Sequence, residues 1–177
     1  IDVLVNNAGV MGVPPLDDNG TQQQQQLFDR HFKINHLGTY LLTRLLLPKM
    51  APNGRIVTVG SEAHRRGAGL NLVPVPDGDG NSTLALEPAL PSNWYSQYGR
   101  SKLGNSLMTL ELSRQLTERN SSIVTSCVSP GRVATNIFRD LGGVVGGVVN
   151  LLASTVFQTP EQGASGVVHA ATSAEFS

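Results

Sequence analysis

The sequence predicts an α/β protein built on a doubly wound parallel sheet, with one domain over residues 1–177. Three short segments rich in β-branched residues, 2–6, 54–61 and 122–128, have the composition of buried parallel strands. Segments with helical periodicity separate and follow them, so strands and helices alternate along the chain. Hydrophobic residues make up 40% of the 177, which is enough for a substantial core.

Two long helices are predicted from apolar residues that recur at helical intervals. One is expected over residues 21–47, with Thr21 and Gln24 as a capping box and Pro48 as its end. We interpret the glutamine run after Thr21 as the solvated first turns of this helix, rather than as a low-complexity segment. The other long helix is expected over residues 94–118.

The sequence also predicts a long loop after the second strand and a helix near the end of the chain. The segment from Glu62 to about Pro91 is polar and rich in proline and glycine, so it predicts a long loop that is either functional or mobile. A last helix is predicted within residues 159–176, with Thr159 as its N-cap and Pro160 at its first position.

The charge balance argues against nucleic acid as a partner. Thirteen basic and thirteen acidic residues give a formal net charge of zero, which leaves no electrostatic footprint for nucleic acid or for an anionic membrane. The single cysteine, Cys127, lies in a predicted strand, where we expect a buried thiol. The four histidines have no spacing typical of a metal site, so no metal is expected.

Tyr98 and Lys102 are the first candidates for chemistry. They are four positions apart on the second long helix, and so lie on one face, whereas Tyr95 has Gly99 at that offset. An ammonium about 4 Å from a phenol, at an effective dielectric of about 20, would lower a pKa near 10 by about 3 units. That would suit Tyr98 for acid/base catalysis near neutral pH. A surface pair is the simpler alternative, but Ser61 at the end of a strand favours the catalytic interpretation.

Five motifs occur together in a set order. They are NNAG (6–9), NHLG (35–38), RIVTVGS (55–61), YGRSK (98–102) and SPGRVAT (129–135). In this order and spacing they resemble the short-chain dehydrogenase/reductase family over nearly the whole chain, and SEAH, SKLGN, LELSRQL and TPEQGA look most like its retinol-dehydrogenase-like branch. The resemblance implies a Rossmann-like fold and hydride transfer between NAD or NADP and a carbonyl/alcohol pair.

The resemblance also implies a role for each matching residue. Tyr98 would be the acid/base, Ser61 would hydrogen-bond the substrate oxygen, and Lys102 would lower the pKa of Tyr98 and hold the nicotinamide ribose. Asn35 would maintain the water that links Lys102 to solvent. The residues that would line the cofactor are Asn7, Ala8 and Gly9 after the first strand and Pro130, Gly131, Val133 and Thr135 after the last.

The sequence departs from the family because it contains no glycine-rich turn of the kind that binds the cofactor pyrophosphate. We therefore expect a partial chain that lacks the first strands, and with them the residue that separates NAD from NADP; NADP is favoured. The strand at residues 2–6 would then expose an apolar edge. We expect the isolated chain to be poorly soluble or inactive.

Residues 141–157 are apolar and uncharged, with glycines at a spacing found in packed membrane helices. The segment is short for a membrane span, and the resemblance makes it a substrate lid suited to a lipophilic alcohol or carbonyl. We favour a cytoplasmic location, with membrane association of a longer protein as the alternative. The two long helices match those that pair in the family's homodimers. The competing functions are an inactive fragment and a non-catalytic interaction scaffold.

Overall fold

The computed structural model describes residues 1–12, 30–66, 69–76, 82–86, 94–131, 133 and 158–176. Its strands are β1 (Val3–Asn6), β2 (Arg55–Val59), β3 (Leu72–Pro76), β4 (Ser82–Leu86) and β5 (Val124–Val128). Its helices are a π-helix (Phe32–Leu37) that continues into α1 (Gly38–Leu46), then α2 (Trp94–Glu118) and α4 (Pro160–Thr172), with 3-10 turns at Leu47–Lys49, Glu62–Arg66 and Ala174–Phe176.

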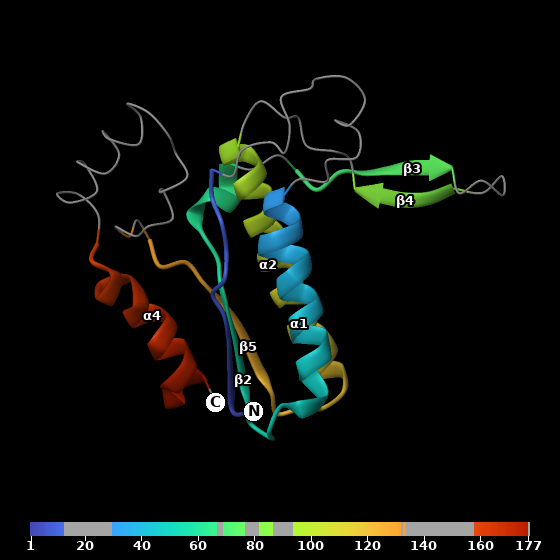
Figure 1. The fold of residues 1–177 in the computed structure, drawn as a ribbon. Coiled ribbons are helices and arrows are strands. Elements are labelled where there is room, and N and C mark those ends of the chain that lie inside the picture. Colours follow the sequence, from blue (N-terminus) through green and yellow to red (C-terminus); the bar gives the residue numbers. More distant parts are fainter. Residues whose placement is uncertain are drawn as a thin grey trace.

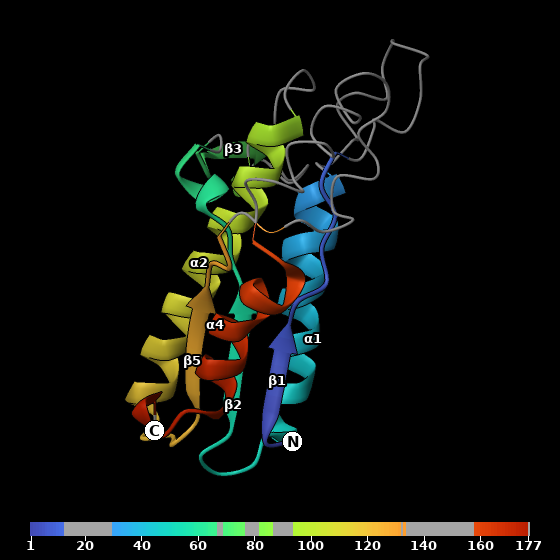
Figure 2. The same ribbon diagram turned by 90° about the vertical axis from the view of Figure 1, so that its left-hand side faces the viewer.

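Three of the strands form the parallel sheet that the sequence predicts. Their order is β1-β2-β5, with Asn6 opposite Thr58 and Thr58 opposite Cys127. Figure 1 and Figure 2 show α1 and α2 on one face of this sheet and α4 on the other. Because all three strands are parallel, their carboxyl ends meet at one edge, which is where ligands bind in such sheets.

The helix ends that the sequence predicts from a cap, a proline or helical periodicity agree with the structure where it describes them. Helix α2 covers residues 94–118, as predicted. Helix α4 begins at Pro160 behind a reciprocal capping box, in which the Gln162 amide donates to the Thr159 hydroxyl (3.3 Å) and the Thr159 amide donates to the Gln162 side chain (2.9 Å). The start predicted for the first long helix, with its capping box and glutamine run, lies outside the described residues.

The long loop predicted between β2 and α2 is wrong in part. Strands β3 and β4 pair there as an antiparallel hairpin, with Val75 opposite Thr83 and Leu72 opposite Leu86. The intervening residues include DGDG, and Asp-Gly between two segments containing β-branched residues is a hairpin signal. The two prolines of LVPVP obscured that signal, because proline is uncommon within strands.

The core has an apolar part and a polar part. Ile56 of β2 packs with Leu112 and Leu116 of α2, and all three are buried. Where α1 meets α2, by contrast, the buried side chains are polar, including Thr39, Thr43, Ser101, Asn105 and Thr109. The polar interior therefore lies along both helices and leads to the carboxyl edge of the sheet.

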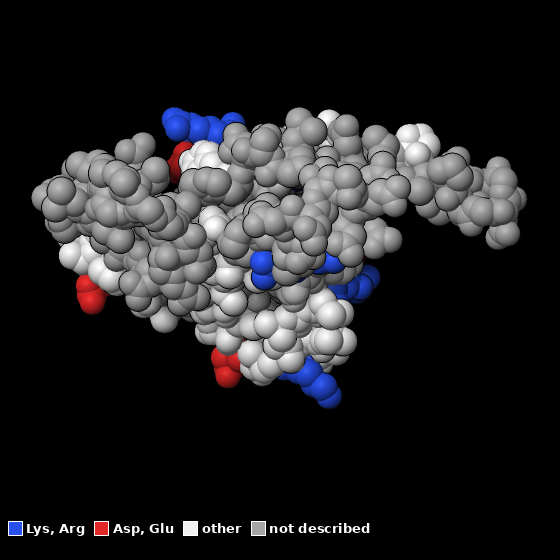
Figure 3. All heavy atoms as spheres, turned by 45° about the horizontal axis from the view of Figure 1, so that its top comes forward, with Lys and Arg blue, Asp and Glu red and all other residues white. Residues whose placement is uncertain are grey.

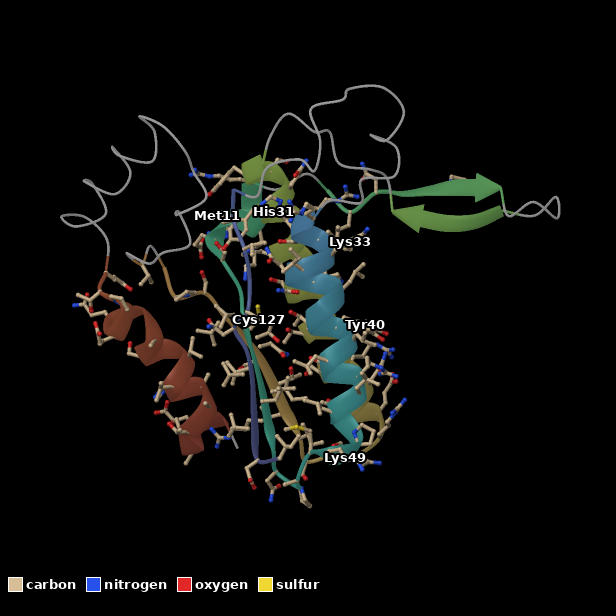
Figure 4. All side chains as sticks on the ribbon, viewed as in Figure 1. Met11, His31, Lys33, Tyr40, Lys49 and Cys127 are labelled. Atoms are coloured by element: carbon tan, nitrogen blue, oxygen red, sulfur yellow. The ribbon has the colours of Figure 1, made fainter. Side chains whose placement is uncertain are left out.

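The outer side of α1 is apolar. Leu41, Leu42 and Leu45 are 57%, 47% and 65% exposed, and Leu110 of α2 is 68% exposed. In Figure 4, Tyr40 likewise points away from the sheet. Helix α1 therefore carries leucines on the face that the chain itself leaves uncovered.

Two expectations about strand side chains had different outcomes. Val3 and Val5 of β1 are 40% and 42% exposed, in agreement with the apolar edge predicted for that strand. The buried thiol predicted for Cys127 is wrong, because this side chain is exposed. Gly60, just past β2, lies beside the sulfur and has no side chain to cover it, since a Cβ there would be 2.9 Å from Sγ. On the face drawn in Figure 3, the charged side chains of the described residues are scattered rather than gathered into one patch.

Candidate active site

The NNAG turn connects the end of β1 to the polar interior. The buried Asn6 donates from its side-chain amide to the Thr43 hydroxyl (2.8 Å), which attaches the strand to α1. Gly9 follows at a close approach, since a Cβ there would lie 3.3 Å from Asn35 Oδ1 and 3.7 Å from Lys102 Nζ. A glycine at this position therefore leaves room beside two of the predicted catalytic residues. Asn7 and Ala8, the other two predicted cofactor residues of the turn, are exposed.

Asn35 is fully buried in the middle of the π-helix. Its side chain forms a two-way pair with the backbone of Val10, because Oδ1 accepts from the amide (2.8 Å) and Nδ2 donates to the carbonyl (2.9 Å). The amide also donates to Ser101 Oγ (3.0 Å), and Ser101 donates in turn to the carbonyl of Tyr98 (2.7 Å). These bonds join the first turn after β1, the π-helix and α2. π-helical segments within α-helices are frequent at functional sites.

Tyr98 is only 6% exposed and packs with Met11 and Ala63, with Tyr95 against the same cluster. Burial raises the pKa of Tyr98, since the phenolate loses hydration, while a hydrogen bond from the Ser61 side chain acts in the opposite direction. The pKa of Tyr98 is therefore raised overall, whereas the sequence argument expected it to be lowered. A pairwise charge argument left out the cost of removing the phenolate from water.

Lys102 is 3% exposed and donates from Nζ to the carbonyl of Val59 (2.8 Å). The ammonium lies 5.7 Å from the centre of the Tyr98 ring, so it is near the tyrosine without ion pairing to it. Burial lowers the pKa of Lys102 to about 8, whereas the nearby Cys127 acts to raise it. At neutral pH this buried lysine is close to its titration range.

Ser61 lies just past β2, with its side chain on the same side as Tyr98. Its hydroxyl accepts from the amide of Ala63 (3.2 Å), and its carbonyl contacts His64 Nδ1 (2.6 Å). The short 3-10 turn that follows thus fixes the serine. The structure therefore brings Asn35, Ser61, Tyr98 and Lys102 together, as the sequence predicts.

The residues predicted after β5 form a separate part of the same edge. Gly131 has a φ of +80°, a left-handed conformation that favours glycine. Val133 forms a parallel bridge with Gln158 and packs so closely on α4 that a Cβ at Gly163 would lie 2.3 Å from its Cγ2. The described contacts of Val133 are thus with the start of α4, not with Tyr98. Pro130 is partly buried, and Thr135 lies outside the described residues.

Three buried residues of this region were not found from the sequence as site residues. They are His31, whose ring lies edge-on to that of Tyr98 at 6.4 Å between centroids, Ser101 and Asn105. In Figure 4, His31 lies beside Met11 at the carboxyl end of the strands. Ser101 and Asn105 are three and seven positions beyond Tyr98, so the helical periodicity of α2 was the available signal.

Parallel strands with helices on both faces, and polar residues gathered at the carboxyl edge, define a dinucleotide-binding type of α/β fold. The family model described as short chain dehydrogenase matches residues 1–72. Polyprenol dehydrogenase of Mus musculus is 35% identical over 181 residues, with 99% of this chain and 49% of the relative covered. Retinol dehydrogenase 14 of Homo sapiens is 34% identical over 179 residues, with 99% and 47% covered.

A solved structure shares the fold. The landomycin C-6 ketoreductase LanV, with bound NADP and rabelomycin, has a TM-score of 0.58 and 23% identity, covering 98% of this chain and 55% of that one. The chain belongs to the short-chain dehydrogenase/reductase family, in its retinol-dehydrogenase-like branch. It spans about half the length of the curated relatives it matches.

The described helices contain no membrane span. Within the part of the chain that the structure describes, none of them combines the length and the hydropathy needed to cross a bilayer. The apolar segment 141–157, predicted as a lid, lies outside the described residues.

Proposed function

We propose that this chain carries the catalytic part of an NAD(P)-dependent oxidoreductase that moves a hydride between the nicotinamide and a carbonyl/alcohol substrate. The observation that carries the proposal is the continuous set of contacts from Asn35 through Ser101 to Tyr98, with Lys102 and Ser61 beside the same tyrosine. An interaction scaffold has no physical need for a buried lysine whose pKa is lowered this far.

In this proposal Tyr98 exchanges a proton with the substrate oxygen, and Ser61 donates a hydrogen bond to the same oxygen. The raised pKa of Tyr98 keeps the phenol protonated at neutral pH, which suits the donation of a proton during carbonyl reduction. Lys102, already near its titration range, supplies charge beside the ring and a route for the replacement proton. Asn35 holds the NNAG turn against α2.

The residues present fit the nicotinamide half of the cofactor. Gly9 leaves open the space beside Lys102 that a Cβ would reduce, and Gly131 provides the left-handed turn after β5. We assign Lys102 to the hydroxyls of the nicotinamide ribose. The other contacts with the nicotinamide half of the cofactor are assigned to two segments. These are the backbone around Asn7, Ala8 and Gly9, and the residues Pro130, Gly131, Val133 and Thr135. The bound cofactor, NADP or NAD, supplies the hydride chemistry.

We favour a lipophilic substrate. The support is the uncharged apolar segment 141–157 and the polyprenol and retinol dehydrogenases among the relatives.

A homodimer through α1 and α2 is part of the proposal, because exposed leucines lie on the outer side of both helices. Because these leucines are 46–68% exposed, burying the rest of each side chain would contribute about 1–2 kcal/mol before the costs of association.

Turnover of the intact protein tests the activity. Oxidation of NADPH and NADH is followed with long-chain isoprenoid aldehydes and with small polar carbonyls, and Tyr98→Phe is compared with Tyr95→Phe. We expect Tyr98→Phe to lower kcat by about 100- to 10,000-fold and Tyr95→Phe to retain most of it. Absence of cofactor oxidation with every carbonyl would refute the proposal, and turnover of the polar carbonyls alone would refute the lipophilic substrate.

A further inference from the structure

The backbone carbonyl of Asn35 is held by two side chains. Thr39 donates to it from Oγ1 (2.8 Å) within the helix, and Asn105 of α2 donates to it from Nδ2 (3.0 Å). Asn35 lies within the π-helix, in which the Gly38 amide bonds back to the carbonyl of Lys33 rather than to that of Ile34, so both side-chain donors bond to the backbone of this π-helical segment. Asn105 is 2% exposed, so its amide is committed to this contact rather than to water.

His36 fixes the orientation of Asn105. Since Asn105 uses its Nδ2 for Asn35, the Oδ1 atom faces His36, whose Nδ1 lies 3.1 Å away. An amide oxygen only accepts, so His36 Nδ1 must carry the hydrogen. Burial lowers the pKa of His36, so near neutral pH the ring is the uncharged tautomer with its hydrogen on Nδ1.

Helix α2 makes room for this ring. A Cβ on Gly104 would lie 2.9 Å from Cγ and 3.0 Å from Nδ1 of His36, which is closer than packed atoms approach. The imidazole is further packed against the Phe32 ring, with centroids 4.7 Å apart. Gly104, Asn105 and His36 therefore form one unit that is independent of the bonds made by the Asn35 side chain.

We propose that Asn105, oriented by His36, is a positioning residue. It would hold the backbone of the π-helix at Asn35 and so set the placement of Asn35 relative to Ser101 and Tyr98. The proposal rests on the oxidoreductase function proposed above. The π-helix carries Asn35, whose side chain reaches both Val10 and Ser101, so a shift of this backbone moves the contacts on both sides of the site. Asn105 itself touches none of the proposed reacting groups.

Four variants of the intact protein test the proposal kinetically. His36→Leu removes the donor to Asn105, and His36→Asn supplies an amide donor in place of Nδ1. Gly104→Ala adds a methyl group on α2 that would push the His36 ring out of place. Thr109→Val is the matched control, because Thr109 is a buried residue of α2 whose hydroxyl, among the described residues, donates to the carbonyl of Asn105. We expect His36→Leu and Gly104→Ala to lower kcat about tenfold with less than about a twofold change in the KM for cofactor.

His36→Asn should recover most of the lost kcat, and Thr109→Val should retain wild-type kcat. The proposal is overturned if folded His36→Leu keeps wild-type kcat, or if Thr109→Val loses as much as His36→Leu. A purely structural role would lower the thermal stability of the variants without this pattern of rescue.

A measurement without substrate separates this inference from the proposed function. Nitrogen-15 NMR of the imidazole should report a hydrogen on Nδ1 of His36, and the Gly38 amide should exchange at least about tenfold faster with deuterium in Asn105→Leu than in Thr109→Val. If the wild type turns over no substrate, the proposed function fails while these readouts still decide the inference. A hydrogen on Nε2 alone, or equal exchange in the two variants, would overturn it.

Discussion

The pH dependence of stability should carry a signature of the buried Lys102. Its pKa falls from 10.5 to about 8 in the folded chain because burial penalises the ammonium. A folded-state pKa below the unfolded value means that the unfolded state binds more protons between the two values. The contribution of Lys102 to the free energy of unfolding is therefore most favourable above about pH 10.5, where the lysine is neutral in both states. That contribution is lost as the pH falls through about 8, where the buried amine takes up its proton.

The size of the effect follows from those two pKa values. Between pH 8 and 9.5 the unfolded lysine stays protonated while the folded one loses most of its proton. By linkage, the free energy of unfolding should rise by about 1 to 2 kcal/mol over that interval because of this residue alone. The pKa of Tyr98, raised by burial, acts in the opposite direction only at higher pH.

The assay is chemical unfolding of the intact protein without added cofactor, at pH steps from 8 to 9.5. Lys102→Met removes the titrating group but keeps an unbranched side chain, and Lys49→Met, at an exposed position, is the control. We expect the wild type and Lys49→Met to share a rise that Lys102→Met lacks. Equal pH slopes for the wild type and Lys102→Met would refute burial as the cause of the shift.

Two further substitutions test the packing of the site. Ser101→Ala should destabilise the protein by about 1–3 kcal/mol, because it leaves a hydrogen of the buried Asn35 amide without its acceptor; in differential scanning calorimetry the exposed Ser113→Ala should cost less than about 0.5 kcal/mol, and equal losses would contradict the bond's importance. Gly163→Ala should destabilise by about 1–3 kcal/mol through overlap with Val133, and Val133→Ala in the same chain should relieve most of it. Failure of the double variant to recover would argue against that overlap.

Much of the fold follows from local signals in the sequence. Helix α2 and the start of α4 at Pro160 are set by periodicity, by the Thr159 cap and by proline itself, all of which act within a few residues. The parallel sheet follows from the alternation of strand and helix. The hairpin β3-β4 was obscured because its signal lies in a proline-containing segment.

The site was predictable in its residues but not in its energetics. Asn35, Ser61, Tyr98 and Lys102 could be named because their motifs occur in a set order. The contact of Asn105 with the π-helix could not, since it joins residues that are 70 positions apart in the chain. The exposure of Cys127 and the raised pKa of Tyr98 also depend on neighbours in space, the first on Gly60 and the second on burial.

The direct test of the proposed chemistry is the transfer of the hydride itself. The intact protein is incubated with NADPH or NADH deuterated at C4 of the nicotinamide and with a long-chain aldehyde, and the alcohol is analysed by mass spectrometry. We expect the deuterium of one C4 face on the carbinol carbon of the product, and almost none with Tyr98→Phe. An alcohol formed without deuterium from either face, or equal transfer by Tyr98→Phe, would contradict the assignment of this site.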